Sequence, residues 1–128
     1  MKTRMTALVM TLGMSGAAVA EPIVGLWKTQ VDDGRYAHVQ IAPCGAAFCG
    51  TIVRSFDSNA EYDSPSRGKQ IVRGFAPKGG GKYAGKVWRP SNDKVYTGKG
   101  AVSGKKMALS GCVAGGLICS KQTWTKID

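Results

Sequence analysis

Apolar side chains recur at every second position over much of the chain that follows residue 20. In residues 36–42, for example, Ala37, Val39 and Ile41 share one face of an extended chain, and polar or aromatic side chains occupy the other. A period of two is typical of a half-buried β-strand. The pattern predicts eight strands, at residues 23–31, 36–42, 48–54, 70–75, 82–89, 94–102, 106–113 and 118–127.

Short connections rich in Gly, Asn, Asp and Pro separate most of these strands, as hairpin turns require. Residues 56–68 are the exception, because they form a long polar and acidic segment without a strand pattern. Consecutive hairpins in a small domain are most simply closed into a barrel, since closure removes exposed edges. We therefore predict an all-β fold, a small eight-stranded antiparallel up-and-down barrel, with a two-sheet sandwich as the alternative.

The first twenty residues have the composition of a secretory signal peptide. Lys2 and Arg4 precede an apolar run at residues 5–14, and small residues follow, ending in Ala18-Val19-Ala20. A run of this length is too short to span a bilayer, which takes roughly twenty residues. Cleavage after Ala20 would deliver the mature chain to the periplasm or release it from the cell. The expected units are a signal peptide, residues 1–20, and a single β-barrel domain, residues 21–128.

All four cysteines lie in the expected mature chain, and an even number in an exported protein indicates two disulfides. The spacings favour Cys44–Cys49, across a hairpin, and Cys112–Cys119, although two other connectivities remain open. Loops this short contribute only about 2 kcal/mol each on a chain-entropy estimate. A zinc site is the rival interpretation, but only one pair has a spacing that zinc ligands commonly use, so we expect no metal.

The chain is strongly basic, with a formal net charge of +10, and loss of Lys2 and Arg4 would leave +8. This excess favours anionic partners. The lysines are scattered, and no basic run is interleaved with aromatic residues as in single-strand binders, so we expect no nucleic acid partner. In an exported protein the accessible anions are envelope lipids, glycans and acidic proteins.

Residues 41–53, Ile-Ala-Pro-Cys-Gly-Ala-Ala-Phe-Cys-Gly-Thr-Ile-Val, resemble the signature of the bacterial domain of unknown function 2147 family. Gly25-Leu26-Trp27 and residues 83–90, 111–113 and 122–125 agree with it, so the resemblance covers nearly the whole expected domain. It implies an exported, lipocalin-like (calycin) small barrel without an established activity. Residues 57–69 are shorter than the loop that many members carry there, so we expect no lid role for them.

Gly25-x-Trp27 also resembles the first-strand signature of lipocalins, in which the Trp closes one end of the barrel. The resemblance implies that Trp27 is a core residue rather than a ligand contact. We accordingly expect Gly25, Trp27 and Trp124 to have structural roles.

Residues that could carry catalysis are few. His38 is the only histidine, and the chain has no G-x-S-x-G elbow, so we expect no catalytic residue, no cofactor and no enzymatic activity. Oxygen-bearing side chains alternate from Asp57 to Asp63, but an EF-hand would need Gly at position 62 and Glu at position 68. A solvated acidic loop explains this segment better than a calcium site.

An eight-stranded barrel is just wide enough to be filled by side chains or to hold one small ligand. We expect an exported binding protein that holds a small apolar or amphipathic molecule, such as an amphipathic anion. The alternative is an interior filled by aromatic side chains. A second hypothesis is an envelope interaction module, such as a protease or lysozyme inhibitor. The side chains expected to contact a ligand are Tyr36, His38, Arg73, Tyr83, Arg89 and Tyr96.

Overall fold

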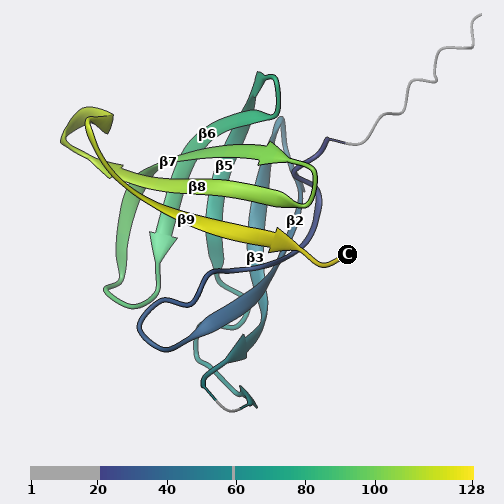
Figure 1. The fold of residues 1–128 in the computed structure, drawn as a ribbon, viewed down its shortest axis with the longest axis vertical. Helices are drawn as coiled ribbons and strands as arrows, with labels where there is room; N and C mark the ends of the chain where they lie inside the picture. Colours follow the sequence, from purple (N-terminus) through teal and green to yellow (C-terminus); the bar gives the residue numbers. More distant parts are fainter. Residues whose placement is uncertain (1–20, 59) are drawn as a thin grey trace, which may run out of the picture.

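Residues 21–58 and 60–128 are described by the computed structural model of the chain, and strands make up most of them (Figure 1). The expected signal peptide, residues 1–20, lies outside the described residues. A single 3₁₀ turn, η2 (Ala114–Gly116), joins the last two strands. The strands are β1 (Gly25–Lys28), β2 (Tyr36–Cys44), β3 (Ala47–Phe56), β4 (Glu61–Tyr62), β5 (Gln70–Gly79), β6 (Lys82–Arg89), β7 (Lys94–Ser103), β8 (Lys106–Val113) and β9 (Ile118–Lys126).

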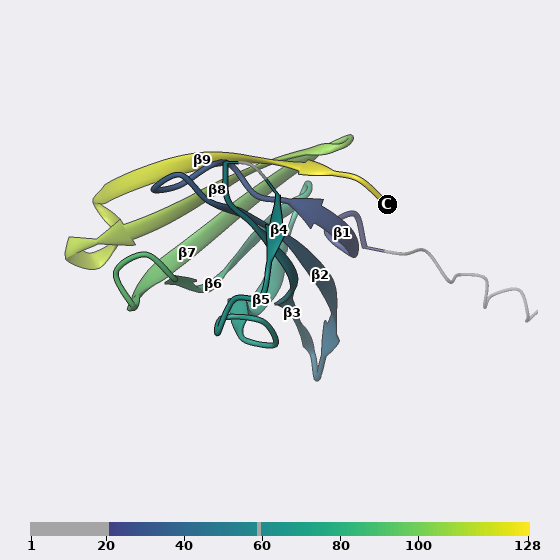
Figure 2. The same ribbon diagram turned by 90° about the horizontal axis from the view of Figure 1, so that it is seen from below.

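Eight of these strands close into an antiparallel barrel. Neighbours in the sheet follow chain order from β5 to β9, β9 pairs with β1, β1 with β2, and β2 with β3, which completes the ring through β5. Figure 2 shows the strands around a common interior, with β8 and β9 on the side opposite β3 and β5. The predicted eight-stranded up-and-down barrel is confirmed, and the sandwich alternative is wrong.

The pairing of β1 with β9 is the thinnest part of the wall, with only two residue pairs in register. Leu26 extends the contact by backbone hydrogen bonds to both Ile127 and Asp128. Beyond β1, the side-chain oxygen of Gln30 accepts a hydrogen bond from the Thr123 amide at 2.8 Å. A side chain thus replaces the backbone ladder there, and this is why the predicted strand 23–31 is shorter in the structure.

The strands of the structure differ from the predicted ones at two further places, residues 56–68 and the end of β5, because of backbone pairing. The segment 56–68, expected to have no strand, contains β4, whose two residues pair with Ser55 and Phe56 at the end of β3. The predicted strand ends at Phe75, because a bulge near Gly74 interrupts the alternation of apolar side chains. In the structure, strand β5 continues past this bulge to Gly79. Gly74 has a φ of 62°, a conformation that glycine adopts without strain.

Both predicted disulfides are present, and no cysteine is free. Cys112 lies directly opposite Cys119 in the β8–β9 ladder. Cys44 lies opposite Ala47 instead, so the first bridge runs diagonally across the β2–β3 hairpin. The two bridges hold hairpins at different places in the barrel.

The core lies inside the barrel, as the alternation of the strands requires. Ala37, Val39 and Ile41 are buried, and their neighbours on β2 are partly or fully exposed, which confirms the predicted faces of this strand. Trp27 and Trp124 are both fully buried in the same cluster. The other members of the cluster are Ile23, Phe48, Ile52, Ile71, Val72, Phe75, Tyr83, Val87, Trp88, Met107 and Leu109.

Candidate functional site

One half of the barrel is filled by large side chains. Trp27 donates a hydrogen bond from its indole nitrogen to the carbonyl of Ile23 at 2.8 Å, so its polar group is satisfied inside the core. The ring of Phe75 is fully buried and lies against Gly98 and Gly100, which face the interior from β7 without a side chain. Because these glycines leave room for the ring, this half needs no ligand to complete its packing.

The other half of the barrel holds a cavity of about 660 Å³ that opens to solvent. This volume is within the usual range of small-molecule sites, roughly 300–1,000 Å³. Its inner wall is mainly apolar, and its rim is polar. The buried residues of the wall are Thr29, Ala37, Ile52, Ser55, Ser64, Ile71, Val87, Trp88, Leu109 and Trp124.

Ser55 is one of three buried polar side chains in this wall, and the other two, Thr29 and Ser64, each accept a hydrogen bond from a backbone amide. It is only 6% exposed and lies opposite Ala37, whose side chain is also buried in the wall. Among the described residues, no group forms a hydrogen bond with the Ser55 hydroxyl. A buried hydroxyl without a partner is unfavourable unless a water or ligand supplies the hydrogen bond.

An ion pair connects a loop to a strand end at the mouth of the cavity. The Arg89 guanidinium donates to both carboxylate oxygens of Asp32, with distances of 2.9 and 2.8 Å, and the Ser91 hydroxyl donates to the same carboxylate at 3.4 Å. The hydrogen bonds from Arg89 lower the pKa of Asp32, while those to Asp32 raise the pKa of Arg89. The pair therefore holds the β1–β2 loop against the end of β6.

Trp88 and Tyr96 border the same cavity and are oriented by short-range hydrogen bonds. The Trp88 indole donates to Asp93 at 2.8 Å, and Tyr96 accepts from the Asn92 amide at 2.7 Å. Lys69 and Arg73 lie over the Trp88 ring, 5.5 and 5.6 Å from its centre. Cations at this distance are attracted by the ring quadrupole, so they hold part of the basic charge close to the cavity wall.

The structure brings together two of the six side chains expected to contact a ligand. Arg89 and Tyr96 lie at the rim of the cavity, whereas Tyr36 borders it but stacks its ring on Phe56. Arg73 is outside the cavity lining but contacts Trp88 within it. Tyr83 lies in the filled half, where its hydroxyl donates to Glu21 at 2.7 Å, and burial raises its pKa to about 12.

His38 lies on the outer face of β2, apart from the cavity. Its ring is 4.6 Å from that of Phe56, which stacks on Tyr36 at 4.8 Å, and Lys28 lies over the Tyr36 ring. Partial burial, with further contributions from the nearby cations Arg54 and Lys28, lowers the pKa of His38. The three rings form an aromatic cluster outside the barrel.

Several cavity residues were missed by the sequence analysis. Asp32 was assigned only to a turn, and that turn is present, with Asp33 and Gly34 at positive φ. Its pairing with Arg89 has no local signal, because the two residues are 57 positions apart. The alternation of β3 and β8 could have indicated Ile52 and Leu109 as interior residues, but not which half of the interior they occupy.

Two other features would indicate a further kind of site: a cluster of metal ligands, and a helix able to cross a membrane. Within residues 21–58 and 60–128, no three His, Cys, Asp or Glu side chains gather where they could hold a metal ion. Over the same ranges, no helix has the length and apolar character needed to cross a bilayer.

Comparison with known proteins identifies the family. Residues 25–126 match the uncharacterised proteins conserved in bacteria that are grouped as DUF2147. The chain belongs to the DUF2147 family. The resemblance inferred from residues 41–53 is therefore confirmed, and the segments that carry it lie within the barrel of this DUF2147 protein.

A similar solved structure is that of a protein from the human pathogen Helicobacter pylori that belongs to the lipocalin family. The TM-score is 0.64 at 15% sequence identity, and the match covers 82% of each chain. At this identity the likeness shows the fold alone, so the DUF2147 protein has a lipocalin-like barrel. No curated protein matches the chain.

Proposed function

We propose that this protein is an exported binding protein that holds a small apolar or amphipathic molecule in the open half of its barrel. The observation that carries the proposal is the cavity of about 660 Å³, because a barrel used only as a rigid scaffold could fill this space with side chains as it does at the other end. The apolar wall would bury the ligand, and polar groups would orient it.

Two kinds of polar anchor support an amphipathic ligand. The buried Ser55 hydroxyl would form a hydrogen bond with a polar atom deep in the cavity. At the rim, Arg89 and Arg35 would attract an anionic headgroup, although Arg89 is already engaged by Asp32. A headgroup that binds Arg89 therefore has to displace the carboxylate or share the guanidinium with it.

Export is supported by the two disulfides, since such bonds persist in oxidising compartments. The contacts of the first described residues support a mature chain that begins at Glu21. Glu21 accepts the hydrogen bond of Tyr83, and Ile23 is fully buried, so the barrel uses the chain from this point.

The direct experiment is native mass spectrometry of the protein purified from periplasm without denaturant. We expect a polypeptide that begins at Glu21 with four hydrogens fewer than the reduced chain, together with an added mass that solvent extraction removes. The same preparation with no added mass, and with no affinity for dodecanoate in calorimetry after extraction, would contradict ligand binding.

Two variants locate the bound molecule. Leu in place of Gly111 adds a side chain that enters the cavity, since the three atoms nearest to a Cβ there all belong to Tyr96, at 3.4 Å or more. Gly111→Leu should therefore abolish dodecanoate binding, whereas Ala108→Leu, on the outer face of the same strand, should leave it unchanged. Ser55→Ala should weaken binding about three- to tenfold by removing one hydrogen bond, without loss of stability.

A further inference from the structure

The β8–β9 hairpin extends beyond the neighbouring strands at the end of the barrel where the cavity opens (Figures 1 and 2). Its tip presents apolar side chains to solvent: Val113 is 47% exposed, Leu117 86% and Ile118 65%. Single exposed apolar residues are normal on a protein surface, but a group of them at a projecting tip is typical of an interaction site.

The tip is held in a defined shape. The Cys112–Cys119 disulfide joins directly opposite residues immediately behind the apolar group. Gly115 and Gly116 have φ values of 68° and 91°, so the turn depends on conformations that glycine favours. A tip that is already ordered loses little conformational entropy when it binds.

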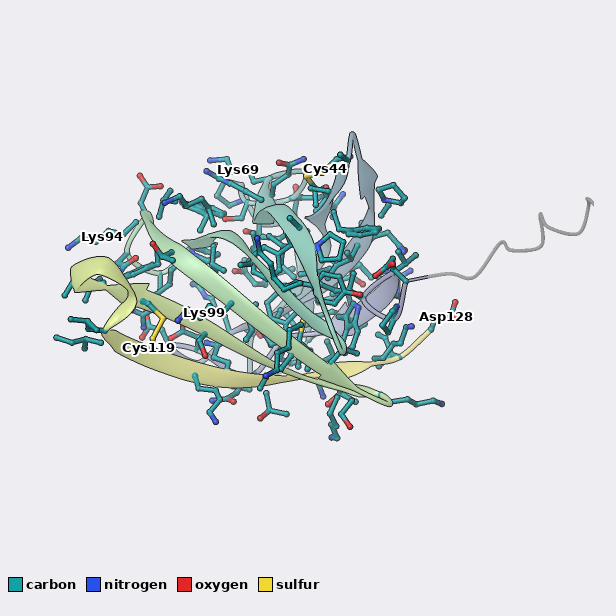
Figure 3. The ribbon with its side chains drawn as sticks, turned by 90° about the horizontal axis from the view of Figure 1, so that it is seen from above. Cys44, Lys69, Lys94, Lys99, Cys119 and Asp128 are labelled. Atoms are coloured by element: carbon teal, nitrogen blue, oxygen red, sulfur yellow. A yellow bond between two sulfur atoms is a disulfide. The ribbon has the colours of Figure 1, made fainter. Side chains whose placement is uncertain are left out.

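Lysines lie beside the tip on the outer face of the barrel. Lys99 of β7, Ser110 of β8 and Lys121 of β9 are in register across three strands. The Lys99 ammonium is 3.8 Å from the position that a Cβ on Gly116 would occupy. Figure 3 shows Lys99 and Lys94 toward the end of the barrel that carries Cys119, away from Asp128.

The charged side chains of strands β6 to β9, which form this part of the barrel wall, are all positive. Strands β6 to β9 contain no Asp or Glu, and residues 64–127 contain thirteen Lys and Arg against one acidic residue, Asp93. Asp93 accepts the hydrogen bond of Trp88. The lysines in these four strands are Lys82, Lys86, Lys94, Lys99, Lys106, Lys121 and Lys126.

We propose that the β8–β9 tip docks on an anionic lipid bilayer, with Val113, Leu117 and Ile118 in the interfacial layer and the lysines against the headgroups. An anionic bilayer offers both an apolar layer for side chains that point beyond the barrel and negative charge over the broad cationic face. The docking stands whether or not the cavity holds a ligand, because none of its three apolar residues lines the cavity.

The test is sedimentation of the mature protein with vesicles of equimolar phosphatidylglycerol and phosphatidylcholine, compared with vesicles of phosphatidylcholine alone. Binding is expected only to the anionic vesicles and should weaken as salt is added, because salt screens the lysines. The double variant Leu117→Ser/Ile118→Ser should bind at least about tenfold more weakly, since burial of one large apolar side chain contributes on that order.

A second pair of variants separates the tip's cations from general basic charge. Lys99→Gln/Lys121→Gln should weaken binding by about fivefold for each lysine. The matched control, Lys78→Gln/Lys105→Gln, removes the same charge from the end of β5 and the β7–β8 turn, at the opposite end of the barrel, and should weaken binding less than about twofold. Thermal unfolding checks that each variant remains folded, as expected for exposed positions.

Independent evidence comes from Leu117→Trp, whose emission should shift to the blue and be quenched by brominated lipid when the tip inserts. No binding to anionic vesicles would overturn the proposal. Binding that the lysine variants weaken but the Leu117→Ser/Ile118→Ser variant does not would also overturn it, because it would show adsorption without insertion. A dimer in sedimentation velocity that the serine variant abolishes would instead assign the tip to a second copy of the chain.

Discussion

Gly98 is a position where a single methyl group should disrupt the packing of the filled half of the barrel. A Cβ at this position would lie 2.4 Å from Val87 Cγ2 and 2.9 Å from the Phe75 ring. Both neighbours are buried, so neither can move into solvent to relieve the contact. Overpacking of this kind typically costs about 1–3 kcal/mol.

The net effect of Gly98→Ala also includes the unfolded chain. Replacing glycine by alanine restricts the unfolded state and by itself stabilises a protein by about 0.4–1 kcal/mol. We therefore expect the free energy of unfolding of Gly98→Ala to fall by about 1–2 kcal/mol. Gly111→Ala is the matched control, because it also faces the interior from a strand but its nearest neighbour, Tyr96 Cβ, is 3.4 Å away. This control should be as stable as the wild type or slightly more so.

The assay is urea unfolding with the disulfides intact, followed by tryptophan fluorescence and checked by circular dichroism. A double-mutant cycle adds a direct test: in a Val87→Ala background, the cost of Gly98→Ala should decrease because the nearest clashing atom is gone. Equal stabilities for Gly98→Ala and Gly111→Ala would refute the inference that close packing at Gly98 separates the filled half from the hollow half.

Three further predictions concern titratable groups. Burial raises the pKa of Tyr83 to about 12, so this residue stabilises the fold fully below pH 10 and loses that contribution as the pH rises toward 12. In an alkaline titration followed by tyrosinate absorbance, the Tyr83→Phe variant should lack the last titration step of the wild type. Asp32, with its pKa lowered by Arg89, stabilises the fold above about pH 3.8 and loses this contribution as the pH falls further, so Asp32→Asn should show a flatter decline of stability in acid. Burial lowers the pKa of His38, so its proton NMR signals should titrate with a midpoint below pH 6.5. Its protonation should reduce the stability of the fold as the pH falls. A midpoint at or above 6.5 would contradict the burial that the structure shows.

The position of Asp32 shows where sequence reasoning ended at the candidate site. Its turn was predicted from Asp and Gly residues, because turn conformations depend on neighbouring side chains. The contact with Arg89 depends on where β6 ends after the barrel closes, and no pattern in either segment records that. In the same way, the alternation of β2 assigned His38 to the face opposite Val39, but did not show that this face lies outside the cavity.

The sequence was sufficient to predict the eight barrel strands, their hairpin order, the favoured pairing of the cysteines and the family of the chain. These features depend on short-range patterns: a period of two, turn residues, and cysteines close together in the chain. Three features became defined only in the tertiary structure: one half of the barrel is filled, Ser55 is buried without a partner in the cavity of the other half, and Lys99 and Lys121 lie in one row. The reason is that interior volume and surface charge are set by side chains from all the strands together, and their register becomes defined only when the ring is closed.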